Sequence, residues 1–408
     1  MTTVLFSQCR VFDGHAPELQ EPLDVLVEDG RIKEVSDRPI RTATARVIPV
    51  NGRTLMPGLI DAHWHVVAAD VNLTRLDGMP ESLRNAHTRI YLEDALNRGF
   101  TTIRDAGGAD FGLALAVDQG LIRGPRIFFG GRALTQIGGH GDMRPQQHLA
   151  ACCQSGAMAQ LADGPIEVRK VIREELRKGA HHIKLMVSGG VASPADPIWM
   201  LQYSEEEIRV AVDETVRRRA YVMAHAHTAE ATRRCVEYGV RSVEHGTLID
   251  RETAEFVAAR EAFVVPTLVV IMTLWEHGAA LGLPPVSMGK LAEVKDAAIG
   301  ALDILRGAGV KVGFGTDLLG SLHSEQSREF LLRAEVLSPY EVLKSATSVN
   351  AELLNRSGEL GVVAPGAVAD LLVVDGNPLE DLGCLQEEGR HLVAIMKGGE
   401  LHKMTLQS

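Results

Sequence analysis

The sequence predicts an α/β fold, a (β/α)8 TIM-like barrel with a small flanking β-sandwich built from both chain ends. Two observations predict it. In the middle of the chain, short apolar runs alternate with charged amphipathic stretches, which is typical of βα units around a parallel sheet. At both ends, short strand-like segments are separated by turns. The composition agrees, because 45% hydrophobic and 23% charged residues over a length of 408 exclude a disordered or fibrous chain.

The two chain ends are expected to pair with each other. The first 55 residues predict a small β-meander with an Asp29-Gly30 hairpin turn. Similar strand-like segments return near the other end, at residues 369–374 and 391–397. We therefore expect residues 1–55 and 360–408 to form the small β-sandwich domain, and residues 56–359 to form the catalytic barrel.

Eight apolar runs predict the barrel strands. The amphipathic stretches between them predict the helices; Ser204 and Glu207, for example, have the spacing of a capping box. Eight strands with intervening helices predict a closed barrel, and an open doubly wound sheet is the alternative. The predicted strands are residues 58–65, 101–104, 126–130, 182–187, 221–225, 242–245, 263–267 and 311–316.

Candidate metal ligands occur at the same end of several predicted strands. His63 and His65 stand at i and i+2 of the first strand, so both imidazoles point the same way and can hold one metal ion. Each residue alone also fits an ordinary exposed or structural side chain. Together they place five histidines, one lysine and one aspartate at one end of the barrel, which chance seldom produces. The remaining members are Lys184, His225, His227, His245 and Asp317.

Lys184 lies within an apolar strand. Burying an ammonium group without a partner costs several kcal/mol, so this lysine must be exposed, neutralised or modified. A snorkelling or ion-paired lysine is the ordinary alternative.

Several motifs resemble those of the metal-dependent amidohydrolase superfamily. Residues 56–65, MPGLIDAHWH, are similar to its PGLIDxHxH segment, and residues 361–374 are similar to the return strand of its flanking β domain. The resemblance covers nearly the whole chain. The loop motif Gly138-Gly139-His140-Gly141 and the segments that follow Lys184 and His225 resemble the branch of Xaa-Pro, Xaa-Arg and Xaa-Lys dipeptidases, N-acyl amino acid hydrolases and ochratoxin-type amide hydrolases.

This resemblance implies a binuclear metal centre. His63 and His65 would bind the more buried ion together with Asp317, while His225 and His245 would bind the second ion. A carbamate formed from Lys184 and carbon dioxide would bridge the two. The implied cofactors are two divalent ions, with zinc preferred and manganese or cobalt also compatible.

The resemblance also implies roles in catalysis. Paired ions would generate a hydroxide that attacks the amide carbon, with Asp317 as general acid/base. His140 would lie near the scissile carbonyl or its oxyanion. His227 stands where many relatives carry tyrosine, so it is either a substrate contact or a structural residue.

The expected function is hydrolysis of the amide bond of dipeptides or N-acyl amino acids. Ochratoxin-like aromatic amides are also candidate substrates. The alternative is a cyclic-amide hydrolase or deaminase, imidazolonepropionase-like. A non-catalytic scaffold is disfavoured, because all six ligand positions are filled. The sequence does not determine which residue leaves. Asp70, Asp142 or Asp196 would suit a basic leaving residue, and Trp199 would suit an apolar leaving residue. His323 either lines the pocket or belongs to a loop.

The remaining features concern partners and location. Lys and Arg number 42 against 53 Asp and Glu, and a net charge of −11 disfavours nucleic acid. We expect no membrane partner, because no apolar segment is long enough to span and the N-terminus lacks a signal peptide. Five scattered cysteines suit a reducing compartment. We therefore expect a cytoplasmic enzyme with a small-molecule amide or dipeptide substrate, and the resemblance implies a homo-oligomer.

Overall fold

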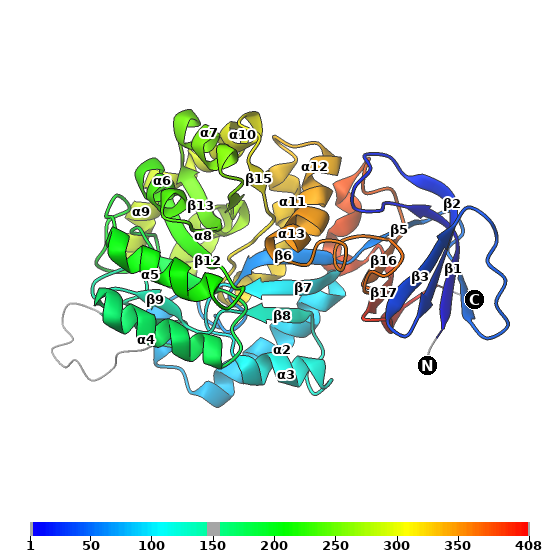
Figure 1. Ribbon diagram of the computed structural model, residues 1–408, viewed down its shortest axis with the longest axis horizontal. Coiled ribbons are helices and arrows are strands. Elements are labelled where there is room, and N and C mark those ends of the chain that lie inside the picture. The colour runs from blue at the N-terminus through cyan, green and yellow to red at the C-terminus, as the bar shows by residue number, and fades with distance from the viewer. Residues whose placement is uncertain (1–2, 145–155, 407–408) are drawn as a thin grey trace.

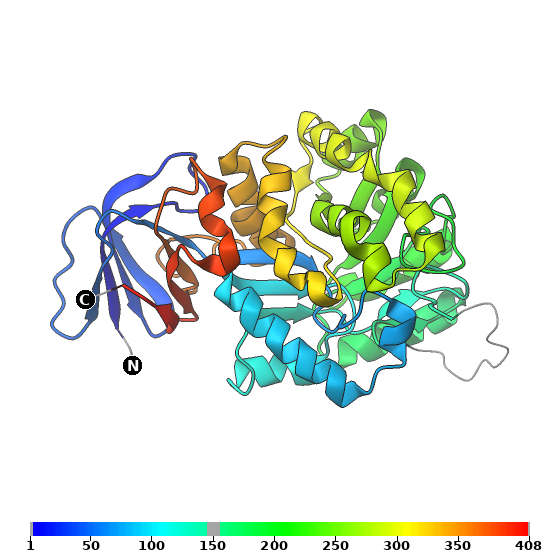
Figure 2. The ribbon, with the colours of Figure 1, turned by 180° about the vertical axis from the view of Figure 1, so that it is seen from behind.

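The computed structural model describes residues 3–144 and 156–406, and shows a barrel with a sheet at one side (Figure 1). Helices surround the barrel strands, and both termini lie at the side sheet, as the opposite view also shows (Figure 2). Part of the long segment 131–164, including Cys152 and Cys153, lies outside the described residues. The other three cysteines are buried free thiols.

The strands of the two chain ends share one sheet and one core. The sheet order is β18-β17-β16-β5-β1-β2-β3, and β4 pairs with β1. The two ends are joined by the antiparallel pair of β5 and β16 and by an isolated bridge between Arg31 and Val368. Strand β5 crosses the predicted domain boundary at residue 55. The strands are β1 (Val4–Val11), β2 (Gln20–Glu28), β3 (Arg31–Ser36), β4 (Arg46–Pro49), β5 (Thr54–Pro57), β16 (Leu371–Val374), β17 (Leu392–Lys397) and β18 (Glu400–Met404).

Each of the eight predicted apolar runs overlaps a barrel strand. Parallel pairing joins β6 to β7 and β8, and β11 through β15 in chain order. The short strands β9 (Ala133–Thr135) and β10 (Ala159–Leu161) extend the sheet beside β11. The barrel strands are β6 (Leu59–Trp64), β7 (Phe100–Asp105), β8 (Arg126–Phe129), β11 (Ile183–Met186), β12 (Val222–Thr228), β13 (Ser242–Leu248), β14 (Phe263–Val265) and β15 (Lys311–Val312).

Backbone hydrogen bonds close this barrel. The amide of Ala62 donates to the carbonyl of Phe314 at 2.8 Å, and the amide of His181 donates to Phe129 at 2.9 Å. The TIM-like barrel prediction is confirmed, and the open sheet is excluded. The last strand is shorter than expected, since β15 ends at Val312 and the predicted strand continues to residue 316. A Cβ at Gly315 would lie 2.7 Å from the Cβ of His63, so glycine permits this close approach.

The helices follow the strands as the amphipathic stretches predict. The capping box of Ser204 and Glu207 forms at the start of α5. Among the described residues, no helix has the length and apolarity needed to cross a membrane. The helices are α1 (Leu73–Asp77), α2 (Glu81–Asn97), α3 (Phe111–Asp118), α4 (Gly164–Arg177), α5 (Glu205–Val216), α6 (Ala229–Glu237), α7 (Arg251–Ala259), α8 (Leu268–Leu281), α9 (Pro285–Lys295), α10 (Ala298–Gly307), α11 (Arg328–Arg333), α12 (Pro339–Lys344) and α13 (Asn350–Leu353).

A buried ion pair joins the side sheet to the barrel. Asp370, just before β16, accepts from Arg126 of β8 at 2.6 Å and from the amide of Gly398 at 2.7 Å. We expect Asp370→Ala to lower the free energy of unfolding by about 1–3 kcal/mol, because Arg126 and the Gly398 amide lose an acceptor that is itself buried. The exposed pair of Arg53 and Asp375 provides the control, and Asp375→Ala should cost less than about 1 kcal/mol. Urea unfolding followed by circular dichroism measures both; equal losses would contradict the prediction.

Candidate active site

Seven of the eight predicted site residues line one cavity. It lies at the carboxyl end of the barrel strands, where barrel enzymes build their active sites. Its wall includes His63, His65, His140, Lys184, His225, His245 and Asp317. His227 lines a smaller adjoining cavity of about 420 Å³, together with His140, His225, His245 and Asp317.

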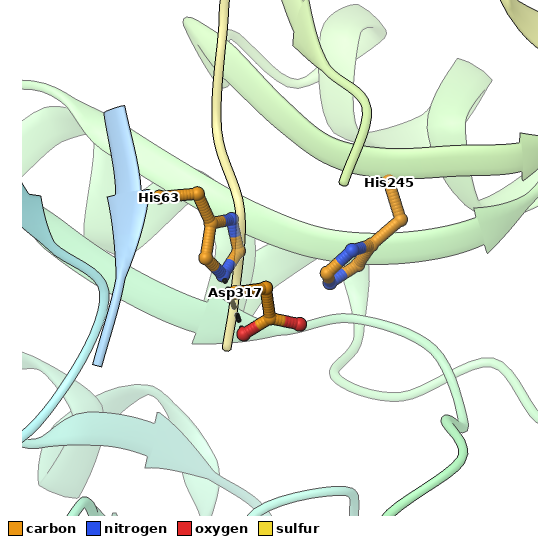
Figure 3. Close-up of side chains that lie close together, drawn as sticks. All are labelled: His63, His245 and Asp317. Carbon is orange, nitrogen blue, oxygen red and sulfur yellow. Dashed lines mark ion pairs between the residues drawn. The ribbon is translucent and has the colours of Figure 1, made fainter. Parts of the chain in front are cut away.

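Three of these side chains form a compact cluster at the centre. The ligand atoms of His63, His245 and Asp317 all lie within 4.8 Å of one another, and the side chains point toward one another (Figure 3). The Asp317 carboxylate is 3.3 Å from Nε2 of His63 and 3.1 Å from Nε2 of His65. His245 and Asp317 have positive φ angles of 72° and 56°. Such strained backbone in non-glycine residues is typical of functional sites.

Each candidate imidazole uses one ring nitrogen in a hydrogen bond that points away from the centre. The other nitrogen of each ring is therefore left to face the centre, and this arrangement is usual for metal-ligating histidines. The outward bonds are His63 Nδ1 to Glu244 (2.6 Å), His65 Nδ1 to the carbonyl of Gly107 (3.1 Å), His245 Nδ1 to Thr267 Oγ1 (2.8 Å) and His225 Nε2 to the carbonyl of Gly189 (3.2 Å).

The charges of the cluster suit metal binding. Burial lowers the pKa of His225 and of His245 well below the usual range, so both rings are neutral and keep a lone pair to donate. Burial disfavours the Asp317 carboxylate, but His63 and His65 outweigh it and hold the pKa of Asp317 well below its usual range. Neutral imidazoles beside an ionised carboxylate fit a divalent transition-metal ion.

Lys184 is buried beside this cluster with a relative exposure of 2%. Its ammonium has no hydrogen bond or ion pair within residues 3–144 and 156–406. Burial lowers the pKa of Lys184 to about 8, although Glu244 and Asp317 oppose this shift. An unpaired buried amine with a lowered pKa fits a lysine that becomes an anionic carbamate, because the neutral amine is the form that reacts with carbon dioxide.

The two predicted substrate contacts differ in their surroundings. The His140 ring stacks on His225, with ring centroids 4.0 Å apart. His227 stacks on His245 at 5.0 Å, and its Nδ1 lies 3.1 Å from Thr247 Oγ1. Burial, helped by His140, lowers the pKa of His227 to about 3. His227 therefore offers hydrogen bonding but no positive charge.

Known proteins resemble the chain over most of its length. The sequence profile of the amidohydrolase family matches residues 54–403. The chain belongs to the amidohydrolase family. Ochratoxinase of Aspergillus niger is 31% identical over 379 residues, which cover 89% of this chain and 77% of that protein.

Two solved structures extend this result. An amidohydrolase structure is 49% identical, with a TM-score of 0.98 and full coverage of both chains. A prolidase structure complexed with N-methylphosphonate-L-proline is 48% identical, with a TM-score of 0.97, and covers 99% of this chain and 100% of that one. The predicted superfamily and its dipeptidase and ochratoxinase branch are thereby confirmed. The protein is a hydrolase of amide or peptide C–N bonds, from a family that is generally metal-dependent.

Some residues considered from the sequence lie away from the catalytic cavity of this amidohydrolase. His323 is buried, accepts from Trp64 Nε1 at 2.7 Å and donates to the carbonyl of Ala68 at 3.2 Å, so it holds the backbone after β6. Trp199 is 72% exposed and lines neither cavity. Asp70 pairs with Arg75.

The remaining acidic candidates are also engaged. Asp142 pairs with Arg144, so it does not stand free to hold a basic leaving residue. Asp196 does not stand free for a basic leaving residue either, because it is 1% exposed, lines neither cavity and receives several hydrogen bonds described below. The acidic side chain that does line the main cavity, apart from Asp317, is Asp77 of α1, which the sequence did not single out.

Sequence reasoning also missed the supporting residues of the amidohydrolase site. Glu244 is fully buried, accepts from His63 and pairs with Arg104 at 3.0 Å. Burial raises its pKa, but Arg104 and His63 outweigh burial and lower the pKa of Glu244 to about 2. Its position next to His245 in the sequence was the available signal. Thr267, which holds His245, carried none.

We expect Thr267→Val to weaken metal binding about tenfold, because the nearly isosteric change removes the oxygen that fixes the His245 ring. Competition with a chromogenic chelator measures the affinity. Thr273→Val is the matched control, since Thr273 is also buried but donates to the carbonyl of Val269 within α8. If both variants bind metal like the parent, the orienting role of Thr267 is wrong.

Proposed function

We propose that this amidohydrolase cleaves the amide bond of dipeptides or N-acyl amino acids at a binuclear divalent-metal centre. The observation that carries the proposal is the unpaired, buried Lys184 amine within a shell of four outward-anchored imidazoles and the Asp317 carboxylate. A single-metal site has no use for a bridging lysine. This disfavours the alternative, a cyclic-amide hydrolase or deaminase of the imidazolonepropionase kind.

The proposed ligands are those expected from the family motifs. His63, His65 and Asp317 would hold one ion, and His225 and His245 the other, with a carbamate on Lys184 between them. We propose zinc, because neutral imidazoles and carboxylates suit it. Bound divalent ions would supply Lewis acidity, which lowers the pKa of a water molecule and polarises the amide carbonyl.

The residues of the chain perform the remaining steps. Asp317, ionised at the centre of the cavity, can accept the proton of the attacking water on a carboxylate oxygen and deliver it to the leaving amide nitrogen. His140 faces the same cavity and can meet the carbonyl oxygen of the substrate. His227, neutral and held by Thr247, can contribute one hydrogen bond from the adjoining cavity.

The cavity wall favours an apolar leaving residue. Besides the candidate ligands, it is formed mostly by apolar side chains, among them Leu73, Leu76, Met143, Met158 and Leu319. Proline and aromatic residues suit such walls better than basic ones. The 48% identical prolidase bound to an L-proline phosphonate and the similarity to ochratoxinase support the same choice. We therefore place Xaa-Pro dipeptides first and aromatic amides second.

A substrate panel tests this function. Zinc-loaded protein in bicarbonate buffer is expected to release an amino acid from Xaa-Pro dipeptides faster than from Xaa-Arg, Xaa-Lys or N-acyl amino acids, as followed by mass spectrometry. Asp317→Asn should lower the rate by about 10²–10⁴, because it removes the proton acceptor. Asp375→Asn, at the exposed side sheet, should leave the rate unchanged. If protein shown to contain metal hydrolyses no substrate of the panel, the proposal is wrong.

The carbamate is tested without measuring activity. In ¹³C-bicarbonate, metal-loaded protein should show a ¹³C carbonyl resonance that disappears in Lys184→Met. Lys290→Gln is the matched control, since Lys290 is also a buried lysine but its ammonium is fully hydrogen-bonded. An active, metal-loaded protein without a Lys184-dependent resonance would show that the bridge is not a carbamate.

A further inference from the structure

A buried hydrogen-bond network lies behind His140, on the side of the ring away from the catalytic centre. It joins the loop between β11 and α5, residues 187–204, to helix α9. Lys290 of α9 is 6% exposed, and its ammonium donates to the carbonyls of Gly190, Ser193 and Asp196, each at 2.7 Å. These three bonds use all three donors of the ammonium. One side chain, about a hundred residues further along the chain, therefore fixes the path of the loop.

Asp196 is the acceptor at the centre of this network. Its carboxylate receives the amide of Gly190 and the side-chain amide of Gln202, both at 3.1 Å, as well as the hydroxyl of Ser193. The Lys290 ammonium lies 3.5 Å from the same carboxylate. Burial alone would raise its pKa, but His140, Ser193 and Lys290 lower the pKa of Asp196 to about 2. The carboxylate is ionised and accepts only.

This acceptor determines which ring nitrogen of His140 carries a proton. A serine hydroxyl has one proton, and that of Ser193 is donated to Asp196. At 2.8 Å from His140 Nδ1, the Ser193 oxygen must then accept, so Nδ1 carries a proton. Asp196 itself is 3.5 Å from Nδ1 and supports the same assignment. Nε2 has no hydrogen-bond partner among the described residues, and it is the nitrogen left for a ligand in the cavity.

The plane of the His140 ring is fixed as well. One face stacks on His225, and the other lies on the backbone of Gly190, where an added Cβ would be 2.3 Å from Cε1 of the ring. The amide of His140 donates to Gln202, which itself donates to Asp196. The backbone and the ring of His140 thus depend on the same loop that Lys290 holds.

We propose that Lys290 is a positioning residue for His140. Its ammonium holds the Gly190–Asp196 segment by three carbonyls and offsets the charge of Asp196, so that Ser193 and Asp196 keep the proton on Nδ1 and direct Nε2 at the substrate. The inference rests on the proposed function of His140 as a substrate contact. It adds that Lys290 of α9, which lines neither cavity, sets the orientation of that contact.

A double-mutant cycle tests the proposal in full-length, metal-loaded protein. Lys290→Met should lower kcat by about 10–100-fold for the best dipeptide of the panel, with a smaller change in KM. In a His140→Ala background, the same substitution should cause less than about a threefold further loss, because its effect passes through His140. An equal fold-loss in both backgrounds would mean a merely structural role and would overturn the proposal.

The double-mutant cycle includes a matched control variant and a replacement variant. Lys295→Met lies on the same helix at an exposed ion pair with Asp296, and it should leave kcat and KM unchanged. Should Lys290→Met fail to fold, Lys290→Gln takes its place in the cycle, because the amide keeps two of the three donors. Chelator competition on each variant sets a metal concentration that saturates the site, because the segment held by Lys290 adjoins Gly189, whose carbonyl orients His225.

A second readout does not depend on turnover. Long-range ¹H–¹⁵N correlation spectra of histidine rings should show a proton on Nδ1 of His140 in the parent, assigned by its loss in His140→Ala. This signature should change in Lys290→Met and in Ser193→Ala, and stay unchanged in Lys295→Met. An unchanged signature in Lys290→Met would overturn the proposal. If the parent hydrolyses nothing in the panel, the proposed function fails, while the spectra still decide whether Lys290 positions His140.

Discussion

The burial of many ionisable groups at one end of the barrel is the constraint on which the rest of the site depends. A charge without a partner in a low-dielectric interior costs several kcal/mol, so each buried group must be neutral, paired or modified. The structure meets this requirement group by group. His225 and His245 are neutral, Glu244 is paired with Arg104, and Asp317 lies against two imidazoles. Among these groups in the described part of the chain, Lys184 alone has no hydrogen-bonded or ionic partner. It is therefore the group expected to be modified.

Each outer hydrogen bond comes from an element other than the one that carries the ligand it holds. Glu244 of β13 holds His63 of β6, and Thr267, at the start of α8, holds His245. Backbone carbonyls of Gly107 and Gly189 serve His65 and His225. A barrel brings successive strands side by side, so a ligand on one strand can be oriented by the next connection. The site is therefore a property of the closed barrel and does not reside in any single motif.

The sequence predicted what depends on local pattern. All eight strands follow from short apolar runs, and His63, His65 and Asp317 could be found because they directly follow such runs. The last strand was predicted too long, since β15 ends at Val312 and the amide of Phe314 already donates outside the barrel sheet, to Ser345. Lys290 could not be predicted, because a lysine on an amphipathic helix is usually exposed and its partners lie about a hundred residues earlier. Asp196 was considered for a basic leaving residue, since the local sequence does not reveal that its carboxylate is buried.

The network behind His140 also affects the metal-binding side of the cavity. His140 and His225 share a stacked contact, so a displaced His140 ring would remove one face of packing from a candidate ligand. The ammonium of Lys290 and the carboxylate of Asp196 lie 3.5 Å apart and nearly cancel as seen from the centre. The network can therefore orient His140 through hydrogen bonds while adding little net charge beside the metal ligands. A carboxylate without the ammonium beside it would lack the three bonds that hold the loop, and it would also alter the electrostatic potential at the centre.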